Sequence, residues 1–453
     1  MSLNYLATRF TCSWPSTTMV LLCDGRLVCG CADPYAQRVL GDARGSSVSA
    51  IWTGPVASGL RADLNRGGSA FCGDCPLKLP LADSDPTPER SLEVGALPSR
   101  LYVECTAACN ISCFQSCCAP ETGITKTRQA GMLDFDLFTR VVDEAGPSLV
   151  RIDFFNYGEA FLHKRALEMC EYIKTRHPHI YLYTSTNGGM FTEEMARRLV
   201  HTGIDEVTFS IDGASQEIYS RYRQRGQFDK VLRNLATVVD ERQRAGRDLP
   251  FVNWRYILFT WNDHDEEMAR AQRLAAEIGV DRLCWEITDH PEDSYSRRFA
   301  PGTPDHARIR HAIWDSNGLG SAIPGGTPRA RIEVRTLPRD EPLRGTAGAP
   351  LRVPTRIRNL SHRRFLATAT HGRRLVRLAA QLCDPDGRLL DRNYARAWLP
   401  GALDAGERVD VAIDLVAPST PGRYQLRFDL VCEGIDWFEN CGSEVTVRPF
   451  DVH

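Results

Sequence analysis

Five cysteines fall within the short stretch from Val103 to Cys118, close enough together to hold metal. Two registers of C-x3-C-x3-C are possible, one beginning at Cys105 and the other at Cys109, because the cysteines stand at Cys105, Cys109, Cys113, Cys117 and Cys118. Three thiolates can hold three irons of a 4Fe-4S cube and leave the fourth iron open to a small ligand. The stretch therefore predicts such a cube, with a zinc site of the same thiolates as the alternative.

A second group of cysteines lies in the first 80 residues. It consists of Cys12, Cys23, Cys29, Cys31, Cys72 and Cys75, with few helix-length segments between them, and predicts a small domain that relies on a metal centre. Four thiolates suffice for one further 4Fe-4S cluster, or for zinc. Because the N-terminus lacks the pattern of a signal peptide, we expect a cytoplasmic protein with reduced thiols, in which clustered cysteines are metal ligands more often than disulfides.

The composition is that of an ordinary globular protein. Of the 453 residues 43% are hydrophobic, which is enough to bury the cores of two or three domains. The net charge is −2, from 55 basic and 57 acidic residues, so nothing indicates a nucleic acid or an anionic membrane as the main partner. No apolar run approaches the length of a membrane span.

The elements that must position the first cysteine group alternate between strand and helix patterns. The predicted strands are 101–105, 150–158, 179–186, 206–212, 252–260 and 281–288. The predicted helices between them are 134–145, 163–176, 192–201, 228–245 and 264–278. Six β-α units imply an α/β fold with a parallel sheet, a partial (β/α)6 barrel, whose working residues lie at the carboxyl ends of the strands.

Three domains are expected: a cysteine-rich module over 1–85, the barrel over 86–325 and an immunoglobulin-like β-sandwich over 326–453. Prolines and acidic residues between 81 and 99 predict a linker, and a Gly/Pro-rich passage from Gly318 to Ala330 predicts another. Beyond that passage apolar and polar residues alternate at strand period. Tyr424 after Pro421-Gly422 resembles the tyrosine corner of such sandwiches.

The cysteine stretch resembles the strand-to-loop signature of radical S-adenosylmethionine (SAM) enzymes. The shared residues are Glu104, Thr106 and the run from Cys109 to Cys113. The usual spacing in that family is C-x3-C-x2-C, whereas this loop is one residue longer and reaches Cys117. The resemblance implies that Cys109, Cys113 and Cys117 hold the cluster, with Cys118 as the rival third ligand.

Later strand ends match the same family in its order. Gly158-Glu159 resembles the motif that contacts the methionine amino group of SAM, and Arg223, one helical turn after Tyr219, is expected near the SAM carboxylate. The other cofactor-binding residues that the resemblance implies are Asn187, Ser210 and Asp212. It also implies reductive cleavage of SAM to a 5'-deoxyadenosyl radical, with electrons from a flavodoxin- or ferredoxin-type donor.

The N-terminal cysteines resemble the SPASM or twitch module of radical SAM enzymes, although that module usually follows the barrel. The shared residues are Asp33, Leu40-Gly41, Ile51-Trp52, Arg61 and the closing C-x2-C. The resemblance implies that one auxiliary 4Fe-4S cluster, or zinc, holds the module together. Its ligands would be Cys12, Cys31, Cys72 and Cys75, with Cys29 as an alternative to Cys31.

The longer cysteine loop, the single auxiliary module and the appended sandwich together resemble the radical SAM diol dehydratases of apramycin and tobramycin biosynthesis. The resemblance implies a paromamine-type aminoglycoside substrate, hydrogen abstraction from C4' and loss of the C3' hydroxyl as water. The 4'-keto-3'-deoxy product would pass to an NAD(P)H-dependent reductase partner.

Loss of the hydroxyl group needs a general base at the C4' hydroxyl or a general acid at the C3' hydroxyl. We favour Glu286, which lies in an apolar strand where burial would perturb its pKa, followed by His290 and Tyr157. Other candidates near strand ends are Asn262, Asp263, Asp289, Glu292 and Asp293.

Other functions remain open. An epimerase or dehydrogenase acting on the same sugars is the first alternative, and an epimerase needs a hydrogen-donor thiol such as Cys284. A non-catalytic, zinc-stapled glycan-binding protein is a more distant one. In the sandwich, Trp398, Trp437 and Phe438 either stack on sugar faces or pack in the core.

Overall fold

The computed structural model of the chain divides into two compact units, Met1–Trp314 and Asp315–His453. The residues that it describes are 9–12, 14–73, 75–80, 95–115, 131–149, 151–247, 249–289, 291–309, 312–314, 328–335, 341–361, 365, 367, 376–401, 403, 406–432, 436–441 and 443–453. Most of both predicted linkers, together with Cys117, Cys118 and His290, lies outside these residues.

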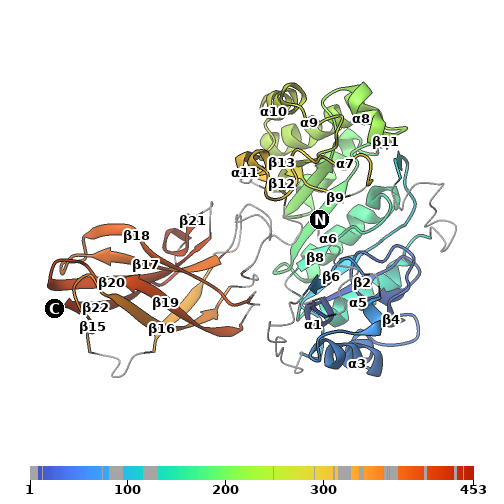
Figure 1. Ribbon diagram of the computed structural model, residues 1–453. Coiled ribbons are helices and arrows are strands. Elements are labelled where there is room, and N and C mark those ends of the chain that lie inside the picture. Colours follow the sequence, from blue (N-terminus) through green and yellow to red (C-terminus); the bar gives the residue numbers. More distant parts are fainter. Residues whose placement is uncertain are drawn as a thin grey trace. The chain divides into compact units, whose positions relative to one another are not determined.

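The first unit is built on a nine-stranded sheet of order β13-β12-β10-β9-β8-β6-β2-β3-β4 (Figure 1). Six strands run parallel in chain order: β6 (Arg100–Val103), β8 (Arg151–Asp153), β9 (Tyr181–Thr186), β10 (Glu206–Ser210), β12 (Phe251–Ile257) and β13 (Arg282–Glu286). Each overlaps one of the six predicted strands. The predicted β/α alternation is therefore confirmed.

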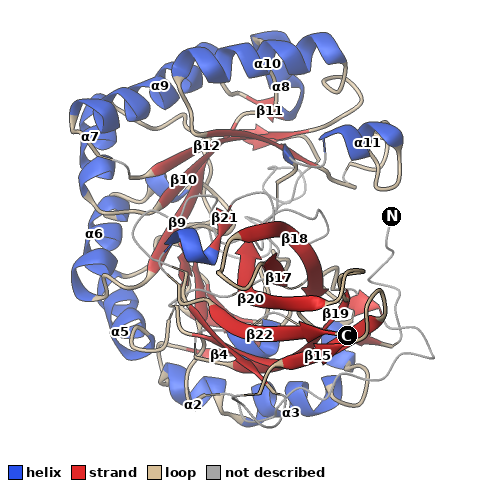
Figure 2. Ribbon diagram, turned by 90° about the vertical axis from the view of Figure 1, so that its left-hand side faces the viewer, coloured by secondary structure: helices blue, strands red, loops and turns tan. Residues whose placement is uncertain are grey.

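Helices join these strands and cover one face of the sheet. They are α5 (Phe135–Ala145), α6 (Ala166–Arg176), α7 (Glu193–His201), α9 (Phe228–Arg244) and α10 (Asp265–Ile278), and Figure 2 shows them as an arc along the outer side of the strands. Side-chain caps fix where two of these helices begin. The Asp134 carboxylate accepts a hydrogen bond from Leu137 N at the start of α5, and the Thr192 hydroxyl accepts one from Met195 N at the start of α7. A shorter helix, α8 (Gln216–Tyr222), precedes α9.

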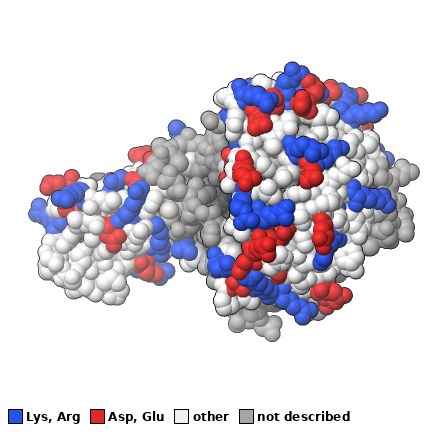
Figure 3. Space-filling view, turned by 90° about the horizontal axis from the view of Figure 1, so that it is seen from above, with Lys and Arg blue, Asp and Glu red and all other residues white. Residues whose placement is uncertain are grey.

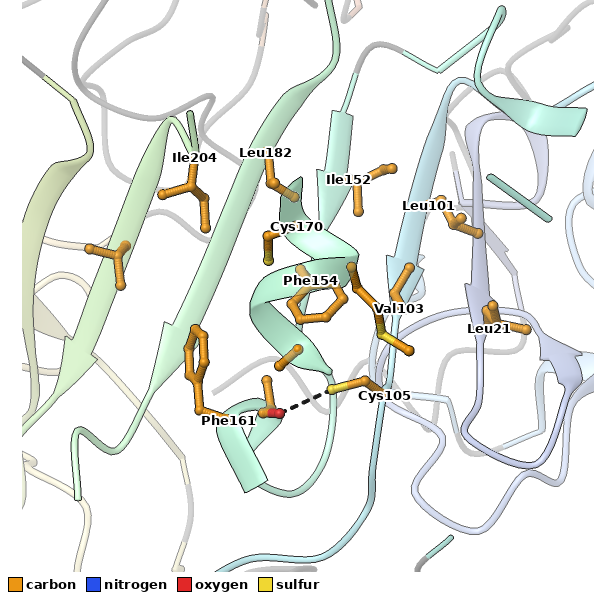
Figure 4. Packing of buried hydrophobic residues seen from close by; sticks show 14 of the residues in the cluster. Leu21, Leu101, Val103, Cys105, Ile152, Phe154, Phe161, Cys170, Leu182 and Ile204 are labelled. Carbon is orange, nitrogen blue, oxygen red and sulfur yellow. Dashed lines mark hydrogen bonds between the residues drawn. The ribbon is translucent and has the colours of Figure 1, made fainter. Parts of the chain in front are cut away.

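Alternate residues of the strands face opposite sides of the sheet. Leu101, Val103, Ile152 and Leu182 belong to the apolar core toward the helices (Figure 4). The other face is polar, and its buried charges are paired: Asp153 lies 2.6 Å from both Arg100 Nε and Arg151 Nη2. Since unpaired buried charges are costly, these pairs hold a polar inner surface in the barrel.

The N-terminal module extends the same sheet. β2 (Thr18–Leu21) pairs in parallel with β6, and β3 (Arg26–Val28) and β4 (Val39–Asp42) continue antiparallel beyond it. Two helices follow, α2 (Val48–Trp52) and α3 (Pro55–Leu64), and their buried faces join the main core. The cysteine-rich module thus shares a sheet and a core with the barrel.

The second unit contains two sheets with one common core. The first has the order β14 (Ala330–Val334), β16 (Pro350–Asn359) and β19 (Arg408–Val416). The second has the order β15 (Leu343–Gly345), β22 (Thr446–Val452), β20 (Gly422–Cys432), β17 (Val376–Cys383) and β18 (Leu389–Trp398), with β21 (Asp436–Trp437) beside β20. Tyr424 Oη donates to Thr420 O at 3.0 Å, the local bond that a tyrosine corner makes. The immunoglobulin-like assignment itself stays a prediction.

Of the three aromatic residues singled out in this unit, Trp437 and Phe438 are buried, whereas Trp398 is 54% exposed and Arg377 lies over its ring. Basic and acidic side chains are interspersed on the face in Figure 3, in keeping with the small net charge. Among the described residues, none of the helices has the length and apolar character needed to cross a membrane.

Candidate functional site

The cysteine stretch begins just beyond the end of β6. Cys105 is buried, and its Sγ donates to Ala160 O at 3.3 Å within the core between sheet and helices (Figure 4). Burial raises the pKa of this thiol, and the nearby Cys170 and Glu159 raise it further. A neutral thiol in an apolar core is a poor metal ligand. The structure therefore favours the register that begins at Cys109.

Cys109 and Cys113 lie beside polar groups from other parts of the barrel. Asn187 Nδ2 is 3.7 Å from Cys109 Sγ, and Arg223 Nη1 is 3.5 Å from Cys113 Sγ. The second contact is fixed by backbone pairing, because β11 (Arg223–Gln224) lies antiparallel to β7 (Ser112–Cys113). N–H donors and a cation stabilise thiolates, so this surrounding fits a thiolate-bound cluster.

Gly158 follows β8 and lies directly against the loop that leads to Cys109. Its φ is +79°, and a Cβ there would be 2.5 Å from Thr106 O and 2.6 Å from Ala108 O. Glu159 N donates to Ala108 O at 2.8 Å. Only glycine permits this approach of the two backbones, so Gly158 sets the position of the cluster loop.

The Glu159 side chain ties the end of β9 to the same region. It is 2% exposed and accepts hydrogen bonds from Thr186 Oγ1 at 2.8 Å and from the backbone of Asn187 at 2.7 Å. Burial raises the pKa of the Glu159 carboxyl, although these hydrogen bonds act in the opposite direction. Its contact with the SAM amino group stays a prediction.

Asp212 and Arg223 form a buried ion pair next to Cys113. Arg223 Nε lies 2.5 Å from Asp212 Oδ2, and Asp212 Oδ1 accepts from Ile257 N at 2.7 Å. Burial opposes the charge of Arg223, but the Asp212 carboxylate and Cys113 raise the pKa of its guanidinium well above the usual value. Asp212 therefore holds a permanent cation beside the cluster loop, and the expected contact of Arg223 with the SAM carboxylate stays a prediction.

Arg255 is a site residue that sequence reasoning missed. It lies on the inner face of β12, where its Nε is 3.1 Å from Glu286 Oε2 on β13 and its Nη2 donates to Ser210 Oγ at 3.0 Å. Burial opposes its charge, yet Glu286 and Tyr183 raise its pKa. The available signal was Arg255 as the one charged residue of the apolar strand β12, next in the sheet to β13, which ends in Glu286.

Tyr222, also missed, is hydrogen-bonded to the cysteine loop through its backbone. Its backbone carbonyl accepts from Phe114 N at 2.8 Å. Burial raises the pKa of its phenol, and both Cys113 and Glu286 add to that effect, so both lie within electrostatic reach of it. Tyr222 therefore lies against the cysteine loop through its backbone.

The remaining candidates are placed differently. Tyr157 is half-buried immediately before Gly158, and His290 lies outside the described residues. Asn262 is buried and holds the loop after β12, donating to Asp212 O at 3.2 Å and Ile257 O at 3.0 Å. Asp263 accepts from Ser296 Oγ at 2.5 Å.

The N-terminal cysteines gather in the core of the module. Cys12, Cys29, Cys72 and Cys75 are all buried. Burial raises the pKa of Cys29, and Cys12, Cys72 and Cys75 each raise it further, so all three lie within electrostatic reach. The structure thus favours Cys29 as the fourth ligand.

Cys31 has different main neighbours. Burial raises the pKa of its thiol to about 12, and its strongest electrostatic contacts are with Arg100 and Asp153, followed by a weaker one with Cys75. It faces the polar inner surface more than the other module cysteines do. Cys31 therefore stays the alternative ligand.

Arg61 and Asp33 hold the frame of the module. Arg61 is buried over the ring of Trp52 and donates to Pro15 O at 2.7 Å and Trp52 O at 2.8 Å. Asp33 closes the turn after the cysteines, accepting from Gln37 N at 2.9 Å and Arg38 N at 2.7 Å. Among the described residues, no three His, Cys, Asp or Glu side chains converge closely enough to hold one metal ion.

Two parts of the chain match known families. Residues 103–271 match the radical SAM superfamily, and residues 12–76 match SPASM, an iron-sulfur cluster-binding domain. Both predicted domains are therefore confirmed.

Similar proteins include the GTP 3',8-cyclase of Desulforamulus reducens, 29% identical over 40% of this chain and 52% of its own. The tungsten-containing aldehyde ferredoxin oxidoreductase cofactor-modifying protein of Pyrococcus furiosus is 36% identical over 40% and 49%. The mycofactocin maturase of Mycobacterium tuberculosis is 33% identical over 43% and 46%. The chain thus spans about half the length of these relatives.

Among solved structures, SuiB of Streptococcus suis bound to S-adenosylmethionine is 13% identical with a TM-score of 0.34, over 42% of this chain and 40% of that one, too slight a likeness to carry an argument. The domain matches and the thiol sites agree that 4Fe-4S clusters and SAM are the cofactors. This chain carries a radical SAM domain preceded by a SPASM iron-sulfur domain.

Proposed function

We propose that the chain is a radical SAM dehydratase that removes the 3'-hydroxyl group of a paromamine-type aminoglycoside. The observation that carries the proposal is the Arg255–Glu286 pair on the inner face of the barrel, where Arg255 also donates to Ser210 Oγ. Ser185 and Ser210, whose hydroxyls lie 3.3 Å apart, continue this polar layer across β9 and β10. Such a layer suits a ligand rich in hydroxyl and amino groups.

When bound, the cluster and SAM supply a 5'-deoxyadenosyl radical that takes the hydrogen atom from the sugar C4'. Glu286 accepts the proton of the C4' hydroxyl, and Arg255, whose Nε lies 3.1 Å from Glu286 Oε2, orients the carboxylate. Removal of that proton strengthens electron donation from the C4' oxygen, and the C3' hydroxyl leaves with a proton as water. One electron from the external donor and one proton then convert the remaining radical to the 4'-keto-3'-deoxy product.

An epimerase or dehydrogenase acting on the same sugars is the alternative within this class. Cys284, the predicted hydrogen donor of an epimerase, is fully buried, and its Sγ donates to Trp254 O at 3.5 Å. Burial raises the pKa of this thiol to about 11. A thiol so enclosed does not favour epimerisation.

The test is the mass of the product. Anaerobically reconstituted protein is incubated with SAM, a reductant and paromamine, and the products are separated by mass spectrometry. We expect a product lighter by one water together with 5'-deoxyadenosine. Loss of two hydrogens would indicate a dehydrogenase, and an isomer of unchanged mass an epimerase. The flavodoxin- or ferredoxin-type donor and the NAD(P)H-dependent reductase belong to the same proposal.

A further inference from the structure

A hollow that is open to solvent lies against the cysteine loop. Its lining comes from the loop itself, from the turn after β9, from α8 and from the start of α9. Asn110 and Ile111 in this lining stand between Cys109 and Cys113, and Asn187 joins them by donating to Asn110 Oδ1 at 2.8 Å. One wall of the hollow is therefore the loop that holds the cluster.

The charge of the lining is one-sided. Arg225 and Lys230 line the hollow, and none of its lining residues within the described part of the chain is acidic. Within the part of the chain that the structure describes, neither cation forms an ion pair, and both are exposed. Helix α9 begins at the same place, but Gln216 Oε1 accepts from Phe228 N at 2.7 Å and Asp229 stands in the first turn, so the positive charge of the hollow comes from the two side chains. The hollow is suited to an anionic group.

Tyr219 gives a second, independent indication of a ligand. It is fully buried and lines the hollow, and its hydroxyl has no hydrogen-bond partner among the described residues. The hydroxyl packs against Gly226, where a Cβ would approach it to 2.7 Å. A buried hydroxyl without a partner is costly, so a hydrogen-bond acceptor in the hollow would relieve that cost.

We propose that this hollow docks the acidic surface of the electron-carrier protein and receives one of its carboxylates. The inference rests on the proposed radical SAM activity but not on the choice of substrate. A carrier seated here lies against the loop between Cys109 and Cys113, which shortens the path of the electron to the cluster. One electron leaves the carrier and one enters the cluster, and no bond is formed or broken.

The test separates docking from chemistry. The double variant Arg225→Glu with Lys230→Glu is compared with wild type for formation of 5'-deoxyadenosine from SAM without any sugar, driven by reduced flavodoxin or by dithionite. With flavodoxin we expect kcat/KM to fall about tenfold or more, with a weaker salt dependence than in wild type. With dithionite the rate should stay within about twofold, because a small reductant needs no docking surface.

The matched control is Arg273→Glu, an exposed residue of α10 outside the hollow, which should leave both rates within about twofold.

An equal fall with dithionite, an equal fall in the control, or no fall with flavodoxin would overturn the docking proposal. If wild type binds inorganic phosphate, the double variant does not, and the rates with flavodoxin are the same for both, the hollow binds a small anion and not the carrier protein. The iron content shows whether a variant has assembled its clusters. If the double glutamate variant has not, the double variant Arg225→Gln with Lys230→Gln is used in its place. Wild-type protein that forms no 5'-deoxyadenosine with either reductant would overturn the radical SAM activity as well.

Discussion

Substitution of Gly158 by alanine should displace the cluster loop. Atoms closer than 3.0 Å to a real Cβ are essentially never seen, and the new Cβ would lie 2.5 Å from Thr106 O, so that oxygen must move by at least 0.5 Å. Cys109 follows three residues later. The positive φ of +79° adds about 1–2 kcal/mol of backbone strain for alanine. Because small misplacements near the reacting groups are costly, we expect SAM cleavage to fall about 10- to 100-fold.

Gly203 provides the matched control. Its φ is +81°, so alanine there meets the same backbone strain, but the nearest atom to the new Cβ is Lys174 Cβ at an ordinary 3.6 Å. Gly203→Ala should lower the free energy of unfolding by about 1–2 kcal/mol while the iron content and the rate of SAM cleavage remain.

The assay measures iron content, the brown absorption of the reconstituted protein, and 5'-deoxyadenosine formed with dithionite. Urea unfolding gives the stability of both variants. If Gly158→Ala retained the cluster and cleaved SAM as fast as Gly203→Ala, the close approach of Gly158 to the loop would have no functional role, and the reasoning from the backbone contact would be refuted.

Three further predictions concern other residues. Glu286→Gln should lower the yield of dehydrated sugar about 10²- to 10⁴-fold, with partial recovery in Glu286→Asp, as measured by mass spectrometry. Cys29→Ala should lose about half of the bound iron and Cys31→Ala should keep it, and the reverse result would restore Cys31 as the ligand. Burial raises the pKa of Asp429 to about 6, so the folded second unit binds this proton more tightly than the unfolded chain does. Its stability should fall by on the order of 2 kcal/mol as the pH rises from about 4 to about 6, and Asp429→Asn should flatten this dependence in urea titrations.

The barrel was readable from the sequence because its strands are short apolar runs between amphipathic helices. The sequence could not show that β2 joins the barrel sheet, since about 80 residues separate it from β6 and pairing at that distance leaves no local pattern. Strand β18 could not be read from the sequence, for another reason. Its residues from Leu389 to Asn393 are exposed, and only Ala395 and Ala397 face the core, so it lacks the alternation of large apolar residues.

The candidate site was predictable where a motif carries it and not where packing decides it. Glycine and acidic residues at strand ends located Gly158, Glu159 and Asp212 in the sequence. The partner of Glu286 was not visible, because the pairing of Arg255 with it depends on the register between β12 and β13. Spacing alone likewise cannot decide between Cys29 and Cys31, which lie two residues apart but have different neighbours in the fold.

The most direct test of the central claim uses paromamine that carries deuterium at C4'. The proposed function predicts one deuterium in 5'-deoxyadenosine and a sugar product that has lost water and the label together. Unlabelled 5'-deoxyadenosine, or a labelled one accompanied by a sugar that keeps its C3' hydroxyl group, would contradict the assignment as a C4'-abstracting dehydratase.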